Sequence, residues 1–184
     1  MLTPRNPLEA SLTEDVPTRM AEAAAPPAAL FHPKLEWALT VAINLDKPYQ
    51  VRPSLYGKSE RWAVYLKDGT FWGPDIKGLV VPHSGADWPI WREDGVIDFD
   101  ARYILQTDDG AVIYMQNRGY RWAEPEYMAA MSRNEEVPFD KYYMRVAPKF
   151  EAPAGKYEWL SRHVFVGVAE KVPKGNCIHY FKVL

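Results

Sequence analysis

The chain has 184 residues, 47% of them hydrophobic and 14% aromatic, so it can build one domain around a substantial core without disulfides. Its 22 basic and 24 acidic residues are spread along the chain, which excludes a basic stripe for nucleic acid and a cationic segment for a membrane surface. Cys177 is the single cysteine, no apolar run approaches the roughly 20 residues of a membrane helix, and the first residues lack an apolar signal-peptide core, so we expect a cytoplasmic protein.

Residues 1–30 differ in composition from the rest. Prolines punctuate a stretch of small and polar residues, and Arg19 to Ala25 is good helix material that ends at Pro26. We interpret this segment as an N-terminal arm with one short helix. The alternative is a lid, or a segment that docks on a neighbouring subunit. Residues 31–184 then form a single β domain.

A strict alternation of apolar and polar residues begins at Leu35 and predicts a half-buried strand. The residues expected on its buried face are Leu35, Trp37, Leu39, Val41, Ile43 and Leu45. The next stretch, from Arg61 to Gly73, reads as a hairpin that turns at Asp68-Gly69, a dipeptide suited to a type I′ turn. A short apolar strand follows around residues 76–81.

The clearest hairpin spans Val96 to Gly119, with Asp109-Gly110 as its predicted two-residue turn. That turn pairs Leu105 with Tyr114 and Tyr103 with Gln116 on one face, and Arg102 with Asn117 and Ile104 with Met115 on the other. A slip of one residue would exchange the faces, so this register is a sharp prediction.

The last third of the body contains one plausible helix, which starts near Glu124 or Pro125. A strand over residues 139–152 is expected to be interrupted at Pro148, as an edge or a bulge. Long strands over residues 156–172 and 176–184 join at a turn near Lys174, which places His179 opposite about Val168. The strands, short turns and single helix predict an all-β fold: a small antiparallel β-barrel of about 8–10 strands, or a strongly curved sandwich.

The loop from His83 to Trp88 carries an imidazole, a hydroxyl, a carboxylate and an indole between two strands. Loops at the mouth of a barrel often carry function. In this interpretation His83 shuttles protons, and Asp87 acts as a base or orients His83. The alternative is that Asp87 caps loop amides and Trp88 plugs the end of the barrel.

Asp98, Asp100 and Arg102 share one strand face. In a polar barrel lumen Arg102 would bind a substrate oxyanion. The alternative, which the pattern favours, is a solvated outer face with a local ion pair, because the opposite face reads as ordinary core.

Arg145 and Glu151 flank Pro148 beside Tyr143. A bulge there would aim Glu151 inward, where burial raises the pKa of a carboxyl and makes it a general acid. The alternative is a structural Arg–Glu pair. Trp159, on a strand face with Ser161 and His163, suits either a ligand wall or a barrel core.

Metal and nucleotide sites are not expected. The four histidines lack metal-ligand spacing, no second cysteine exists, and no glycine loop precedes a helix. We therefore expect neither a metal nor a cofactor.

Several of these segments carry a family resemblance. The matching elements are GTFWGPDIKGLVVP (69–82), GADW (85–88), DARYILQTDDGAVIYMQNRG (100–119), YYMR (142–145), FEA (150–152) and YEWLSRHVFVG (157–167). Together they resemble the uncharacterised protein family 0311, also called domain of unknown function 3237. The resemblance implies a small antiparallel β-barrel and little about activity. Departures from the family pattern are His83-Ser84 in place of glycine before ADW, Ser161 in place of asparagine, and the N-terminal arm.

The preferred hypothesis is a small-molecule enzyme without metal or cofactor. Acid–base groups at His83, Asp87 and Glu151 would catalyse isomerisation, cyclisation, or addition and elimination on a largely apolar or aromatic substrate. The substrate-binding residues would be Trp72, Trp88, Arg102, Tyr143, Arg145 and Trp159.

Two alternatives remain open. The first is a barrel that binds a hydrophobic small molecule without changing it, and the second is a structural barrel that forms a homodimer. An open pocket that contains Asp87, Trp88 and Glu151 would favour the enzyme or the binding barrel, whereas a tightly packed interior would contradict both.

Overall fold

The computed structural model describes residues 33–51 and 58–184. The predicted N-terminal arm, residues 1–30, lies outside the described residues. No helix in these two ranges is long and apolar enough to cross a bilayer.

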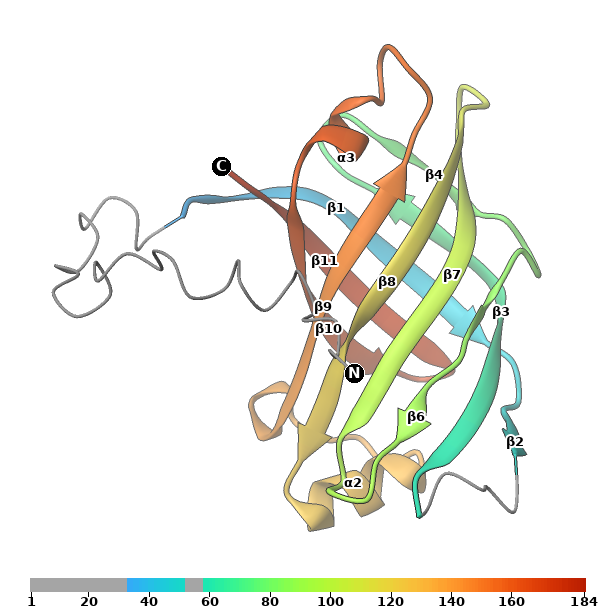
Figure 1. The fold of residues 1–184 in the computed structure, drawn as a ribbon, viewed down its shortest axis with the longest axis vertical. Coiled ribbons are helices and arrows are strands. Elements are labelled where there is room, and N and C mark those ends of the chain that lie inside the picture. Colours follow the sequence, from blue (N-terminus) through green and yellow to red (C-terminus); the bar gives the residue numbers. More distant parts are fainter. Residues whose placement is uncertain (1–32, 52–57) are drawn as a thin grey trace, which may run out of the picture. The chain divides into compact units, whose positions relative to one another are not determined.

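The described residues form a closed antiparallel barrel (Figure 1). The strands are β1 (Leu35–Leu45), β2 (Tyr49–Val51), β3 (Glu60–Trp72), β4 (Lys77–Val80), β5 (Ala86–Asp87), β6 (Ile90–Trp91), β7 (Ile97–Thr107), β8 (Val112–Ala123), β9 (Tyr142–Glu151), β10 (Phe165–Val172) and β11 (Gly175–Val183). Within the described chain, eight strands close the wall in the order β1-β11-β10-β9-β8-β7-β4-β3, and β3 pairs back with β1. The predicted fold class is confirmed.

The wall between β3 and β7 is built from short pieces. β4, β5 and β6 each pair with both of these long strands and follow one another along the same gap. β2 extends the sheet beside β3. Because this part of the wall consists of short strands, the loop after Pro82 can turn Asp87 toward the barrel interior.

Alternation along the strands builds the core. Leu39, Val41 and Ile43 of β1 are buried, as the period of two predicted. The pairing register of β1 with β11 shifts between Trp37 and Leu39, and this irregularity leaves Leu35 and Trp37 exposed. The predicted buried face of β1 is therefore confirmed at its centre and wrong at Leu35 and Trp37.

The predicted hairpin at Asp68-Gly69 is wrong, because β3 runs unbroken through both residues. A Cβ on Gly69 would lie 2.4 Å from the carbonyl oxygen of Ala42. The glycine therefore serves the close approach of β1 to β3, and the register shift between Asn44 and Leu45 takes up the irregularity.

The predicted register of the β7–β8 hairpin is wrong by one residue. Leu105 pairs with Ile113 and Arg102 with Gln116. The cause is a three-residue loop, Asp108 to Gly110, in which Gly110 has φ +88° and the amide of Thr107 donates to the carbonyl of Ala111 at 2.9 Å. On β8 the slip exchanges the inner and outer faces.

The helices lie at opposite ends of the barrel (Figure 1). α2 (Pro125–Ser132) begins at the predicted proline. α3 (Trp159–Arg162) contradicts the predicted long strand, since the chain forms a helix before β10 begins at Phe165. β9 continues through Pro148, so the predicted interruption of this strand is wrong. Pro148 lies beyond Val146, where the pairing of β9 with β10 ends, so its missing N–H costs no hydrogen bond to β10.

The C-terminal hairpin follows the sequence prediction. His179 pairs with Val168, and Lys174 occupies the turn with φ 71°. β11 inserts between β10 and β1, so the C-terminal residues are tied into the wall.

Candidate functional site

The barrel interior contains a carboxyl group. Asp87 lies on β5 between Val64 of β3 and Ala101 of β7, and its side chain points into a cavity of about 30 Å³. Apolar walls such as Phe99 and Met144 form most of the lining. A volume of this size corresponds to roughly one water molecule.

The surroundings of Asp87 shift its protonation. Its Oδ1 accepts a hydrogen bond from the amide of Asp100 at 3.0 Å. Burial raises the pKa of Asp87 to about 7, more than the Asp100 amide and the charge of Arg121 lower it. Near neutral pH the carboxyl is therefore divided between its acid and base forms, which suits a group that both gives and takes a proton.

Two phenol groups lie deep in the same interior. Tyr103 and Tyr180 are fully buried, and neither hydroxyl has a hydrogen-bond partner of good geometry among the described residues. Burial raises the pKa of both phenols above its ordinary value. Both hydroxyls therefore stay protonated, and they lie close enough together for each to affect the pKa of the other.

Further polar atoms on the interior strands are buried without a hydrogen-bond partner in the described part of the chain. They are Trp62 Nε1, Asn117 Oδ1, Arg121 Nε and Asn176 Oδ1. A buried polar atom without a partner costs about 1–3 kcal/mol, and native proteins contain few of them. Asn117 and Asn176 line the same cavity as Asp87, and the charge of Asp87 acts on Arg121, which marks this interior as the candidate site.

Asp87 is the only one of the nine predicted site residues that the described structure places in this interior. The open pocket predicted to contain Asp87, Trp88 and Glu151 is not formed. The interior is nearly filled, so the packing criterion favours neither the enzyme nor the binding barrel, and the case for a site rests on the polar groups of the interior. Asp87 is separated from His83, which lies on the outer surface with its Nδ1 3.9 Å from Asp46 Oδ2.

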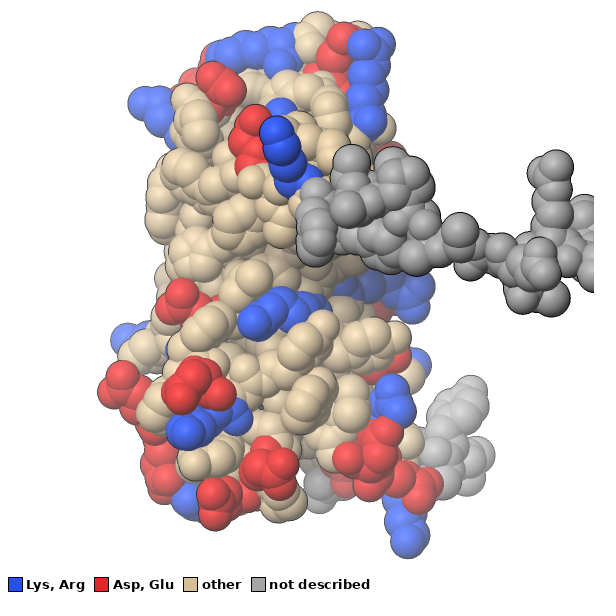
Figure 2. Space-filling model, turned by 90° about the vertical axis from the view of Figure 1, so that its left-hand side faces the viewer, with Lys and Arg blue, Asp and Glu red and all other residues tan. Residues whose placement is uncertain are grey.

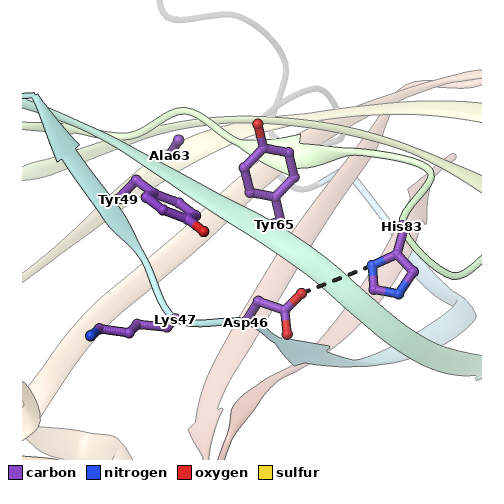
Figure 3. A pocket seen from close by; sticks show the side chains of 6 residues that line it. All are labelled: Asp46, Lys47, Tyr49, Ala63, Tyr65 and His83. Carbon is purple, nitrogen blue, oxygen red and sulfur yellow. Dashed lines mark ion pairs between the residues drawn. The ribbon is translucent and has the colours of Figure 1, made fainter.

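Figure 3 shows the surroundings of His83, an open surface hollow of about 630 Å³. Tyr49 and Tyr65 contribute aromatic rings to it, and Asp46 faces the imidazole. His83 has φ 57°, a conformation that glycine adopts more easily, which explains the glycine expected at this position. Asp87 does not orient His83 here, so that version of its predicted role is wrong.

Arg102 lies on the outer face of β7, where its Nη2 contacts Asp100 Oδ2 at 3.2 Å. This is the local ion pair that the sequence pattern favoured. Glu151 is exposed on the outer face of β9 opposite Tyr114, so the predicted inward bulge is wrong.

Arg145 and Tyr143 also face outward. The guanidinium of Arg145 lies 5.2 Å from the centroid of the Tyr143 ring, and Tyr143 stacks on Trp122. Neither residue reaches the interior, and their predicted roles in substrate binding stay predictions.

The three tryptophans predicted to bind substrate are spread over the barrel. Trp72 and Trp88 are more than two-fifths exposed. Trp159 lies on α3 and packs against Phe165 at the end of the barrel away from α2. Their predicted roles also remain predictions.

Sequence reasoning missed Asn117, Arg121, Asn176 and Tyr180. A signal for two of them exists: Ile113 and Met115 are core residues, and the same alternation carries on to Asn117 and Arg121. The wrong hairpin register assigned this series to the opposite face. Asn176 and Tyr180 follow in the same way from Ile178 on β11.

The outer surface offers no comparable concentration of unpartnered groups in the described ranges. Figure 2 shows that charged side chains of both signs gather toward the two ends of one face and that its middle is largely uncharged. No group of three or more His, Cys, Asp or Glu residues in the described chain is arranged to hold a metal ion.

Comparison with known proteins identifies relatives along the barrel. A UPF0311 protein of Clostridium acetobutylicum is 34% identical over 149 residues, which cover 80% of this chain and 92% of that protein. The crystal structure of a beta-barrel like protein from Acinetobacter baumannii superposes with a TM-score of 0.70 at 30% identity and covers 89% of this chain and 100% of that one. A hydroalkoxylation enzyme of Penicillium herquei is 25% identical over 118 residues, 64% of this chain and 63% of the enzyme.

The family model of a protein of unknown function, DUF3237, matches residues 33–183, the full length of the barrel. These matches confirm the resemblance seen in the sequence: the chain is a member of the DUF3237 (UPF0311) family.

Proposed function

We propose that this protein is a cofactor-independent enzyme that catalyses proton transfer inside the barrel, with Asp87 as the general acid and base. The observation that carries the proposal is the set of unpartnered polar atoms around a buried carboxyl with a pKa of about 7. A purely structural core has no use for such atoms, because each one lowers stability. A substrate that supplies the missing partners restores the lost hydrogen bonds.

The reaction we favour is the addition of a hydroxyl group across a carbon–carbon double bond within one molecule. The protonated Asp87 gives its proton to one alkene carbon, the substrate hydroxyl oxygen bonds to the other, and the hydroxyl proton returns to the Asp87 carboxylate. Atoms balance without any co-reactant, so the product is an isomer of the substrate. The relative described as a hydroalkoxylation enzyme supports this choice.

The interior polar groups fit such a substrate. Tyr103 and Tyr180 would donate hydrogen bonds to its oxygen atoms, and Asn117 Oδ1 would accept one from a hydroxyl group. The apolar walls favour a hydrophobic or aromatic ligand. Since the cavity holds only about 30 Å³, binding requires the interior to widen. Phe99 and Leu45 line the cavity and are partly exposed.

The test uses 2-allylphenol and related alkenyl phenols in D₂O, followed by mass spectrometry of the product. The wild-type protein should form a cyclic ether that carries one deuterium on carbon. Asp87→Asn should lower turnover by about 10²- to 10⁴-fold, the usual contribution of a positioned general acid. The outer-face variant Asp98→Asn serves as the matched control and should keep its turnover.

If Asp87→Asn lowers turnover by less than tenfold, Asp87 is not the catalytic acid and base.

The second candidate function is a barrel that binds a hydrophobic molecule without changing it, and it rests on the apolar lining of the cavity. It takes the place of catalysis if an alkenyl phenol binds but is recovered without deuterium.

A further inference from the structure

Arg121 occupies an unusual position for an arginine. It follows Asn117 and Gly119 on the inner face of β8, and its Nε is buried without a hydrogen-bond partner in the described chain. No carboxylate lies within ion-pair distance of it among the described residues. Asp87 is the negative group that acts on its pKa most strongly, but burial outweighs that effect and lowers the pKa of Arg121.

Lys171 brings a second cation into the same interior. It pairs with Asn176 on β11, and its Nζ donates to the carbonyl of Gly175 at 3.1 Å. It forms no ion pair with any described residue. Burial, and after it the positive charge of Arg121, lowers the pKa of Lys171, so the two cations are close enough to repel each other.

The charges of this interior are therefore unbalanced. Arg121 and Lys171 face a single carboxyl group, and near neutral pH Asp87 carries only part of a negative charge. Two desolvated like charges are unfavourable unless an anion joins them. Asn176, directly across from Lys171, lines the cavity together with Asp87, which places Lys171 at the edge of the same space.

We propose that Arg121 and Lys171 bind an oxyanion of the substrate, and that this group is a carboxylate. A carboxylate is ionised at neutral pH and matches the two parallel N–H groups of a guanidinium. This inference rests on the proposed function, because it takes the interior around Asp87 as the reaction site. The substrate is then an unsaturated, largely apolar acid, anchored by its anionic end while its double bond meets Asp87.

The test measures the binding of benzoate and of benzamide, its neutral counterpart, by isothermal titration calorimetry at pH 7. The wild-type protein should bind benzoate at least tenfold more tightly than benzamide. Arg121→Gln and Lys171→Met should each reduce that preference to less than threefold. Arg118→Gln and Lys149→Met are the matched controls on the outer faces of β8 and β9 and should keep it.

Equal affinity for benzoate and benzamide in the wild-type protein would overturn the proposal, as would a preference that survives in both interior variants. Thermal unfolding without ligand separates binding from a structural role. Because Arg121→Gln removes a buried charge that has no partner, this variant should have an unchanged or higher Tm. A clear fall in Tm for both interior variants would mean that these cations hold the fold together, and would also overturn it.

The two proposals fail in different ways. Asp87→Asn should lose turnover and keep the preference for benzoate, because it leaves both cations in place. If Asp87→Asn keeps turnover while the preference holds, catalysis by Asp87 is wrong and the anion site stands. If the preference is absent while Asp87→Asn loses turnover, the anion site alone is wrong.

Discussion

At the scale of single residues, the molecule is distinguished by one aspartate whose neighbours keep it partly protonated. The amide of Asp100 favours the charged form of Asp87, and burial in the barrel disfavours it more strongly. The same residue at the protein surface would be fully ionised at neutral pH. Its position inside the wall, rather than its chemistry, sets it apart from the exposed Glu151.

Asp87 should make folding stability depend on pH. Its pKa is about 7 in the folded protein and about 4 in the unfolded chain, so between these values the folded state holds one more proton. Its contribution to stability is complete below pH 4 and is lost as pH rises through 7. Relative to Asp87→Asn, the wild-type protein should lose about 3 kcal/mol of unfolding free energy between pH 4.5 and 7.5.

Urea unfolding of both proteins across this range provides the measurement. Asparagine keeps the oxygen that accepts from the Asp100 amide, so the comparison isolates the charge. A constant difference between the two proteins from pH 4.5 to 7.5 would show that the carboxyl of Asp87 is not shifted.

Among the secondary-structure elements, the short strand β5 positions Asp87. It can do so only because Gly85, the residue before this strand, has no side chain. A Cβ on Gly85 would lie 1.7 Å from the carbonyl oxygen of Arg102, and the Gly85 carbonyl accepts from the amide of Leu66 at 3.1 Å. The glycine therefore lets the loop lie between β3 and β7. His83 and Ser84 precede it without disturbing this approach, since the Ser84 hydroxyl accepts from the amide of Ile104.

Gly85→Ala should displace β5 from β7. We expect a loss of about 3 kcal/mol or more of unfolding free energy, at the upper end of overpacking effects, together with loss of turnover. Gly95→Ala is the matched control: Gly95 has φ +83° and open space around it, so alanine there costs about 1 kcal/mol through backbone strain alone. Chemical denaturation compares the two, and equal losses with intact turnover would contradict this account of β5.

The β7–β8 hairpin shows how much one turn decides. Asp109 sits in the three-residue loop, and its carboxylate accepts hydrogen bonds from Tyr157 at 2.9 Å and from Lys156 at 2.8 Å. The hydrogen bond from Lys156, together with those from Thr107 and Tyr157, holds the pKa of Asp109 below its usual range. The bonds from Lys156 and Tyr157 also tie the hairpin to the loop before α3. The acidic residues of this turn are thus explained by structure, although the loop has three residues where two were predicted.

At the scale of the whole barrel, closure joins segments from the two ends of the domain. β11 pairs along its length with β1 on one side and β10 on the other. Because β11 also carries Asn176 and Tyr180, closing the wall and completing the polar interior are the same event. The core and the site therefore fold together.

Removal of residues 175–184 should abolish folding. Without β11 the edges of β1 and β10 are left unpaired, and Phe165 and Ala169 lose their cover. Circular dichroism and size-exclusion chromatography should show an unfolded or aggregated chain. Deletion of the exposed Leu184 alone serves as the control and should leave the barrel intact, whereas a folded monomer after the longer deletion would contradict the importance of closure.

The family resemblance was carried by sequence motifs. The sequence was also sufficient for the fold class, the helix at Pro125 and the C-terminal hairpin with its His179–Val168 pair. These follow from local signals, since strand periodicity and turn residues act over a few positions. Tertiary structure decided which face of each strand turns inward, because a single extra loop residue exchanges the faces of β8. It also decided the site: Asn117, Arg121, Lys171 and Tyr180 come from strands that meet only when the barrel closes, and only a closed interior removes the water that would otherwise satisfy them.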